Sequence, residues 1–280
     1  MFLSINLRVL ICLLLATFWQ CSAASPIIDE HSAVASTNAT LVKRWFPSFL
    51  GYENDPDRLE RVKSAFEDAV WMMRNVLTAP LFELVFDAYF DGPDDHDRVL
   101  NVFRNIVAPD PADTANEVMR YLVFDNLDKT GECAAELKNN PNVVAILIPD
   151  QVTWKTAKIV FCDKAWAYPD LDDINCDDLG DTVTSRMSSL GGVVLHEFMH
   201  FRPVAVPAIG EPIIDRAYGP LTVRQFKEDH PTRAVINADN YRWYAQHVYF
   251  NNKCGRRFSG PRSPAEAGDP QCGGQVCQIQ

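Results

Sequence analysis

The sequence from Gly191 to Gly219, GGVVLHEFMHFRPVAVPAIGEPIIDRAYG, has the pentapeptide His-Glu-Phe-Met-His near its start. His196 and His200 are four residues apart, so on a helix their imidazoles lie on one face and can reach one metal ion. Glu197 follows the first histidine directly and can accept a proton from a water molecule bound to that ion. The spacing is therefore typical of a metal site that hydrolyses its substrate.

The residues around this motif predict a buried helix. Apolar side chains lie on nearly all of its sides: Val193, Val194, Leu195, Phe198 and Met199. Pro203 is expected to end the helix close to Arg202. Unpaired polar groups are costly in such a helix, so the two histidines and the glutamate need partners. A core helix with hydrogen-bonded histidines is the alternative to the metal site that we predict.

A zinc ion with two histidine ligands takes a third protein ligand and leaves its fourth position to water. A third histidine six residues after the second is excluded, because Val206 occupies that position. The nearest acidic residues downstream are Glu211, Asp215, Glu228 and Asp229. We favour Asp215 because it opens the run Asp-Arg-Ala-Tyr-Gly, with Glu211 and Glu228 as the alternatives.

His-Glu-x-x-His followed by Asp-x-x-Tyr-Gly resembles the aspzincins, the deuterolysin-like fungal metalloendopeptidases. The resemblance implies that Asp215 is the third zinc ligand and that the Tyr218 hydroxyl stabilises the tetrahedral intermediate. The Asn-Ala-Asp-Asn-Tyr run at 237–241 is also similar to the family. So is the Val-Phe-Cys run at 160–162, where the resemblance implies an edge strand that pairs with extended substrate.

The chain departs from the family pattern in two places. The second motif of the family begins Gly-Thr, whereas here Gly210 is followed by Glu211 and the loop to Asp215 is longer than the motif allows. In members that cleave before lysine, the acid of the Asn-Ala-Asp run and a second acid three residues later hold the lysine ammonium. Asp239 matches the first, as a candidate substrate-binding residue, but Arg242 replaces the second. We therefore predict that cleavage is not strictly directed to lysine.

The N-terminal residues predict secretion. Residues 1–23 resemble a signal peptide, because Arg8 precedes an apolar run that is too short for a membrane span. Residues 24–44 end in a Lys-Arg pair and form either a pro-segment or an unprocessed disordered arm. We expect a secreted, extracellular protein.

Apolar periodicity predicts an α+β domain over residues 45–254, which the family resemblance implies is zincin-like, and an irregular cysteine-containing tail over 255–280. The expected order is a helical N-terminal part, a small mixed or antiparallel sheet, the metal helix and a C-terminal helix. Helices are predicted over 57–77, from Asp94, from Asp110 and over 232–250, and strands over 143–148 and 158–162.

The cysteines indicate the redox environment of the protein, and the net charge indicates which classes of partner are disfavoured. Of eight cysteines, two leave with the signal peptide, and an even number in a secreted chain implies disulfides. We predict a bond between Cys162 and Cys176, which would close the loop between the second strand and the metal helix. The formal net charge of −11 does not favour nucleic acid or an anionic membrane as a partner.

Two functions are compatible with these patterns. The first is a secreted zinc endopeptidase with one Zn²⁺ per chain and Glu197 as general base, acting as a monomer on proteins or peptides. The second is a non-catalytic secreted protein that binds or scavenges zinc, or serves as an interaction protein, on the same scaffold. The altered loop after Gly210 favours the second function. The intact Glu197 favours the first, which we predict, because zinc binding alone requires no base at that position.

Overall fold

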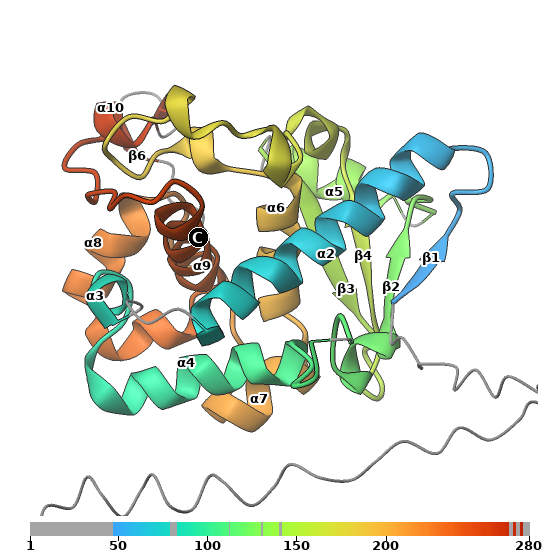
Figure 1. The fold of residues 1–280 in the computed structure, drawn as a ribbon. Helices are drawn as coiled ribbons and strands as arrows, with labels where there is room; N and C mark the ends of the chain where they lie inside the picture. The colour runs from blue at the N-terminus through green and yellow to red at the C-terminus, as the bar shows by residue number, and fades with distance from the viewer. Residues whose placement is uncertain are drawn as a thin grey trace, which may run out of the picture. The chain divides into compact units, whose positions relative to one another are not determined.

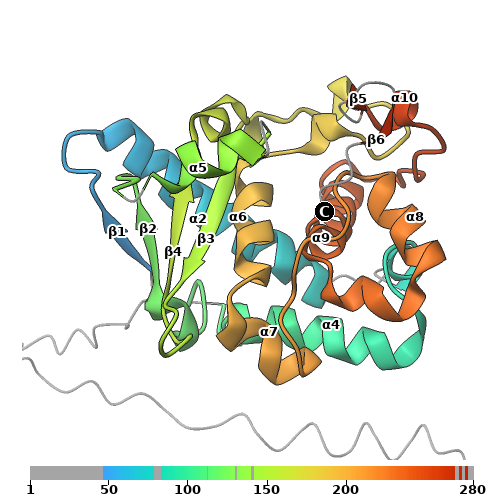
Figure 2. The same ribbon diagram turned by 180° about the vertical axis from the view of Figure 1, so that it is seen from behind.

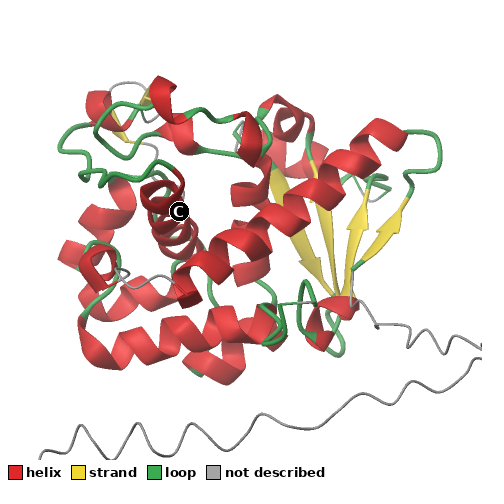
Figure 3. Cartoon of the chain, in the orientation of Figure 1, coloured by secondary structure: helices red, strands yellow, loops and turns green. Residues whose placement is uncertain are grey.

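The computed structural model describes residues 47–78, 83–111, 113–129, 131–139, 142–268, 271–272 and 275–276. The predicted signal peptide and pro-segment lie outside these residues. The fold is α+β, with the strands of the main sheet gathered beside α2 and α6 and other helices on the far side of α6 (Figure 1; Figure 3). None of the helices in the described part of the chain combines the length and the apolar character that a membrane span needs.

Two long helices form most of the N-terminal part, as predicted. They are α2 (Pro56–Thr78) and α4 (Gly92–Ile106), and a short helix, α3 (Glu83–Phe86), lies between them in the chain. The apolar stripe of α2 is buried from Val62 to Val76, and Phe66 on it meets Phe198 of the predicted metal helix edge to face, with 5.9 Å between ring centroids. The apolar spacing of α2 therefore packs directly against the helix that bears the motif.

The prediction of a helix that begins at Asp110 is wrong. The chain forms a 3-10 turn there (Glu117–Tyr121) and passes directly into strand β2 (Leu122–Asp125). Met119 and Leu122, whose spacing suggested a helix, are both fully buried, one by the turn and the other by the strand. Short apolar runs of this kind do not distinguish a helix from a strand.

The main sheet has four strands in the order β1-β2-β4-β3. The other strands besides β2 are β1 (Ser48–Leu50), β3 (Ala145–Pro149) and β4 (Ala157–Phe161). β1, β2 and β4 run parallel, and β3 is antiparallel to β4, so of the two predicted kinds, mixed or antiparallel, the sheet is the mixed one. However, β4 is paired on both sides, so the expectation of an edge strand at 160–162 is wrong, and the edge strand next to β4 is β3.

The His-Glu-x-x-His motif lies on α6 (Leu190–Met199), between β3 and α9 (Ala238–Lys253) (Figure 1; Figure 2). The hydroxyl of Ser189 caps this helix by accepting from the Gly192 N–H at 3.0 Å. Gly192 lets α9 approach closely, since a Cβ at this position would lie 1.9 Å from the Gln246 amide oxygen of α9 and would displace that side chain. Pro203 does not end α6; it lies in the first turn of α7 (Arg202–Ile209).

The C-terminal part contains α8 (Thr222–Asp229), a 3-10 segment (Pro231–Ile236) and then α9. The helix predicted over 232–250 is therefore confirmed only from residue 238 onward. The irregular tail predicted over 255–280 is wrong in part. It contains α10 (Pro264–Ala267) and an antiparallel pair, β5 (Gln271–Cys272) and β6 (Gln275–Val276).

Two disulfides join distant parts of the chain, Cys133 to Cys162 and Cys176 to Cys254. The predicted bond between Cys162 and Cys176 is therefore wrong. Cys133 belongs to α5 (Glu132–Asn139), which packs on β3 next to the end of β4. Cys176, in the segment that follows β4, lies instead beside Cys254 at the C-terminal end of α9. There the Arg256 side chain donates a hydrogen bond to the Leu179 carbonyl. These neighbours are set by tertiary packing, which cysteine spacing does not encode.

His247 makes the stability of the fold depend on pH. Its ring is 4% exposed, with Nδ1 3.3 Å from the Tyr89 hydroxyl and Nε2 3.0 Å from the Phe258 carbonyl oxygen. Burial lowers the pKa of His247 to about 4. The unfolded chain, with a pKa near about 6.5, binds the proton first as pH falls. The free energy of unfolding should therefore drop by up to about 3 kcal/mol between pH 6.5 and 4.

Replacement of His247 by Gln should flatten this acid limb of the stability curve. Denaturant unfolding at intervals between pH 4 and 7 measures the effect, with His230→Gln as the control at an exposed histidine. Equal slopes for the two variants would show that another group controls acid stability.

Candidate metal centre

The two histidines of the motif meet at the C-terminal end of α6. His196 is 7% exposed and lies in the last turn, and His200 caps the helix. Their Nε2 atoms are 3.3 Å apart, because the four-residue spacing places both rings on one face of the helix, where they meet edge to face. This confirms the geometry predicted from the spacing.

Asp215 reaches both histidines from the loop between α7 and α8. Its Oδ1 lies 3.1 Å from His196 Nε2, and its Oδ2 lies 3.3 Å from His200 Nε2. Oδ1 is buried and accepts no hydrogen bond of acceptable geometry, despite this proximity. The alternatives, Glu211 and Glu228, are both exposed. Asp215 is thus the acidic residue that completes a three-residue cluster with the histidines.

The spacing of these donor atoms fits a zinc ion. Ligand atoms at about 2.0–2.2 Å in a tetrahedral site are separated by about 3.4 Å. The separations between His196, His200 and Asp215 are 3.1 to 3.3 Å, and one ligand atom from each lies within 4.8 Å of the others. The buried Asp215 Oδ1 without a hydrogen bond also needs a partner. A bound cation would provide that partner.

The second nitrogen of each ring is fixed by the protein. His196 Nδ1 is 3.0 Å from Asp239 Oδ1, and His200 Nδ1 is 3.1 Å from the Ile213 carbonyl oxygen. An N–H at Nδ1 that donates to these oxygens leaves the lone pair on Nε2. Both rings are therefore held in the tautomer that can bind a metal.

Asp239 lies in the first turn of α9, next to the Nδ1 atom of His196, and is 1% exposed. Its Oδ2 accepts from the Gly219 N–H at 2.7 Å and from the Trp243 indole N–H at 3.0 Å. Burial acts to raise the pKa of Asp239, but Arg242, 3.5 Å away, and His196 outweigh it and hold that pKa below its usual value. The structure corrects the prediction that Asp239 lines a substrate pocket, since both of its oxygens bind groups of the protein.

Glu197 occupies the side of α6 that faces β3 and is 5% exposed. The main-chain N–H of Leu147, in the middle of β3, donates to its carboxylate. Burial raises the pKa of Glu197, and the charges of the two neighbouring histidines oppose that rise. A carboxylate with a raised pKa is suited to take up and release a proton near neutral pH.

Tyr218 lies beside the cluster, three residues after Asp215. Its ring stacks on the His196 ring with 5.6 Å between centroids and 23° between planes. Burial and the nearby Asp215 carboxylate raise the pKa of the Tyr218 hydroxyl. The hydroxyl therefore keeps its proton and can act as a hydrogen-bond donor.

The loop that bears Asp215 is fixed by Asn237, whose role the sequence did not reveal. The Asn237 side-chain oxygen accepts from the N–H groups of Arg216 and Ala217 at 2.7 and 3.1 Å. Its amide nitrogen donates to the Ala217 carbonyl at 3.0 Å. The main chain of Ile214 pairs with the same segment through a parallel bridge. The buried Asn237 thus orients the residues on both sides of the candidate ligand.

The longer loop after Gly210 does not displace Asp215. Gly210 ends α7 in the left-handed conformation, with φ of 88°, and its N–H bonds to the Val206 carbonyl. The additional residues form the exit from this helix, and the pairing at Ile214 then sets the course of the loop. The departure from the family pattern therefore lies outside the cluster.

Asn237→Ala should lower the affinity for zinc by about 10- to 100-fold, because residues that orient a metal ligand typically contribute this much to metal affinity. Competition with a chromophoric chelator measures the affinity. Asn252→Ala, on the surface at the other end of α9, is the matched control. If both variants bind zinc as the wild type does, Asn237 has no part in positioning the ligand loop.

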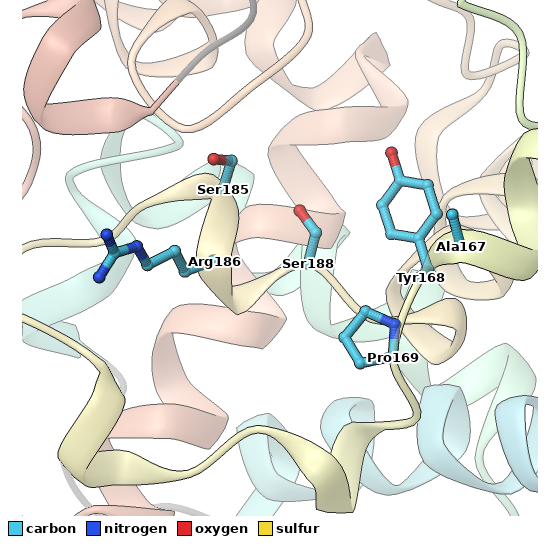
Figure 4. Close-up of a pocket in the computed structure, with 6 residues that line it drawn as sticks. All are labelled: Ala167, Tyr168, Pro169, Ser185, Arg186 and Ser188. Carbon is cyan, nitrogen blue, oxygen red and sulfur yellow. The ribbon is translucent and has the colours of Figure 1, made fainter.

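A surface pocket lies beside the N-terminal end of α6, the end opposite to the two histidines. It is lined by Ala167, Tyr168, Pro169, Ser185, Arg186 and Ser188 (Figure 4). The hydroxyls of Tyr168 and Ser188 point to the same side, and Arg186 points away. Ser188 lies before the first turn of α6, whereas His196 lies in its last turn, so the pocket is separate from the metal cluster.

A buried helix with a His-Glu-x-x-His motif beside an open sheet edge is the arrangement of a metallopeptidase. The chain belongs to the aspzincin family: the family model, described as lysine-specific metallo-endopeptidase, matches residues 85–246, more than half of the chain. This result confirms the family resemblance and the zincin-like class expected from the motifs.

Two individual proteins resemble parts of the chain. A peptidyl-Lys metalloendopeptidase from Armillaria mellea is 31% identical over 71 residues, which are 25% of this chain and 18% of that protein. The match therefore spans less than a fifth of this relative. The structure of a zinc peptidase from Grifola frondosa aligns with a TM-score of 0.38 and 18% identity, over 69% of this chain and 96% of that one.

Proposed function

We propose that this protein is a secreted zinc-dependent endopeptidase that binds one zinc ion through His196, His200 and Asp215. The observation that carries the proposal is the Asp215 carboxylate, whose two oxygens face the two Nε2 atoms at 3.1 and 3.3 Å, with buried Glu197 beside them. Membership of a metallo-endopeptidase family supports the same reaction.

When bound, zinc would polarise the scissile carbonyl and acidify the attacking water. Glu197 takes a proton from that water and delivers it to the leaving amine nitrogen, and its raised pKa suits both transfers. Tyr218 donates its hydroxyl proton in a hydrogen bond to the oxyanion of the tetrahedral intermediate. Asp239 and the Ile213 carbonyl hold the two imidazoles in place during these steps.

The substrate pairs with the open edge of β3. The bonds from Cys162 N–H to Val144 and from Asp150 N–H to Thr156 fix which residues of β3 face β4. By the alternation of an antiparallel pair, the main-chain groups of Ala145, Leu147 and Pro149 face away from β4. Leu147 bonds to Glu197, so a peptide along this edge passes the catalytic carboxylate.

Cleavage is not strictly directed to lysine. Asp239 is buried and its charge is balanced by Arg242, which is 11% exposed and 3.5 Å away. An acid in this state offers little attraction to a substrate ammonium. The lysine preference in the names of the family model and of the fungal relative is therefore not assigned to this chain.

Secretion is part of the proposal. It rests on the predicted signal peptide and is supported by the two disulfides, which persist in oxidising compartments. Protein or peptide substrates outside the cell are the expected partners, with the chain acting as a monomer.

The decisive experiment is proteolysis by the purified secreted protein. Metal analysis should give one zinc per chain, and an unfolded protein such as reduced casein should be cleaved. A chelator should stop the cleavage and added zinc should restore it. A protein that holds zinc in the folded state but cleaves nothing would favour the non-catalytic zinc-binding function.

A further inference from the structure

The turn between β3 and β4 contains an unusual backbone conformation. Trp154 has φ of 58°, and it is the one non-glycine residue with a positive φ among those that the structure describes. Glycine or asparagine normally occupies such a position, because a Cβ is crowded there. A large aromatic residue kept in this conformation indicates a constraint on where its ring lies.

Arg202 covers the Trp154 ring. Its guanidinium carbon lies 4.6 Å from the ring centroid, which is a cation–π contact. Within the part of the chain that the structure describes, Arg202 makes no ion pair. The acid of the turn, Asp150, is already engaged by the Val152 N–H at 3.0 Å and by the Thr153 hydroxyl. The donors of Arg202 are therefore available to a ligand.

This pair lies at one end of the proposed substrate strand. β3 and α6 run side by side toward α7, where Arg202 follows His200 by two residues (Figure 2). Leu147 marks the level of Glu197, and the turn begins three residues later at Asp150. At about 3.3 Å per residue, the turn begins about 10 Å from the catalytic carboxylate.

A peptide that pairs antiparallel with β3 directs its residues before the scissile bond toward this turn. The side chain about three positions before that bond then approaches the Trp154 ring and the Arg202 guanidinium. Trp154 is 37% exposed, so part of its ring can contact the stem of that side chain. A carboxylate at the end of the stem matches the guanidinium fork.

We propose that Trp154 and Arg202 form a substrate subsite that selects an acidic side chain about three residues before the scissile bond. This inference rests on the proposed peptidase function. It adds a preference that depends on residues outside the metal cluster.

Peptides that differ only in Glu, Gln or Lys at this position test the proposal. The wild type should cleave the Glu peptide about two- to fivefold faster than the Gln peptide in kcat/KM, the range of an ion pair at a partly exposed site. In Arg202→Gln this ratio should fall to about one. Trp154→Gly, which accepts the left-handed backbone, should also lower the ratio because the guanidinium loses its support.

Lys155→Gln is the matched control, because it removes the same charge from an exposed residue of the same turn. It should keep the Glu-to-Gln ratio of the wild type. An equal ratio in Arg202→Gln and the wild type would overturn the subsite, as would an equal loss in Lys155→Gln and Arg202→Gln. A wild type that binds zinc but cleaves none of the peptides would overturn both the subsite and the peptidase function, whereas equal cleavage of all the peptides would overturn the subsite alone.

Discussion

Glu197→Gln is expected to retain the zinc ion and to lose proteolysis. The amide cannot accept a proton from water, and general-base catalysis contributes about 10²–10⁴-fold to such reactions. The amide oxygen can still accept the Leu147 N–H, so α6 and β3 should stay in place. The variant should therefore fold and bind zinc as the wild type does, with kcat reduced by this factor.

Casein cleavage, zinc content and thermal unfolding of the same preparation check this result. Glu211→Gln is the control, because it makes the same chemical change at an exposed residue of the loop before Asp215. Full activity in Glu197→Gln would assign the proton transfer to another group. A loss of zinc would mean that Glu197 holds the ion or the fold rather than the proton.

The parts of the fold that the sequence predicted are those specified by local patterns. The three–four spacing of α2 places its apolar residues on one buried face, and β-branched runs bounded by prolines mark β3. The four-residue separation of His196 and His200 is likewise a local property of one helix. Each of these predictions depends only on residues that are close together in the sequence.

The errors concern contacts between distant segments. Which strand is the sheet edge depends on strand order, and the pairing of Cys176 with Cys254 spans 78 residues. Asp239 shows the same limit. Its position matched the family run, but only the fold reveals that Gly219 and His196 bind both of its oxygens. A sequence match identifies the residue and leaves its partners undetermined.

The sequence contained a partial signal for the role of Asn237. It lies two residues before Asp239 in a run already set apart by its resemblance to the family. A buried asparagine can satisfy several main-chain groups at once, which suits it to hold an irregular loop. The pattern did not indicate which loop, because Arg216 and Ala217 are about 20 residues away in the chain.

Asp215→Ala is expected to lower zinc affinity by more than about 100-fold, because the loss of residues that merely orient a ligand already reduces affinity by 10- to 100-fold. Only two imidazoles would remain, which is fewer than the three protein ligands of a catalytic zinc site. At the zinc concentration that gives the wild type full activity, the variant should show no proteolysis. The fold should persist, since Asn237 holds the loop through the main chain of the neighbouring residues.

Chelator competition gives the affinity, and the zinc-dependent rise in melting temperature gives an independent measure, because a ligand stabilises only the state that binds it. Asp229→Ala removes an equal charge from an exposed position and should keep both values. Unchanged zinc binding in Asp215→Ala would contradict the proposed ligand set. Glu211 and Glu228 would then be the next acids to test, and because both are exposed, either would require the chain to move before it reached His196 and His200. The two oxygens of Asp215 need no such movement, since they already lie 3.1 and 3.3 Å from the two imidazole nitrogens.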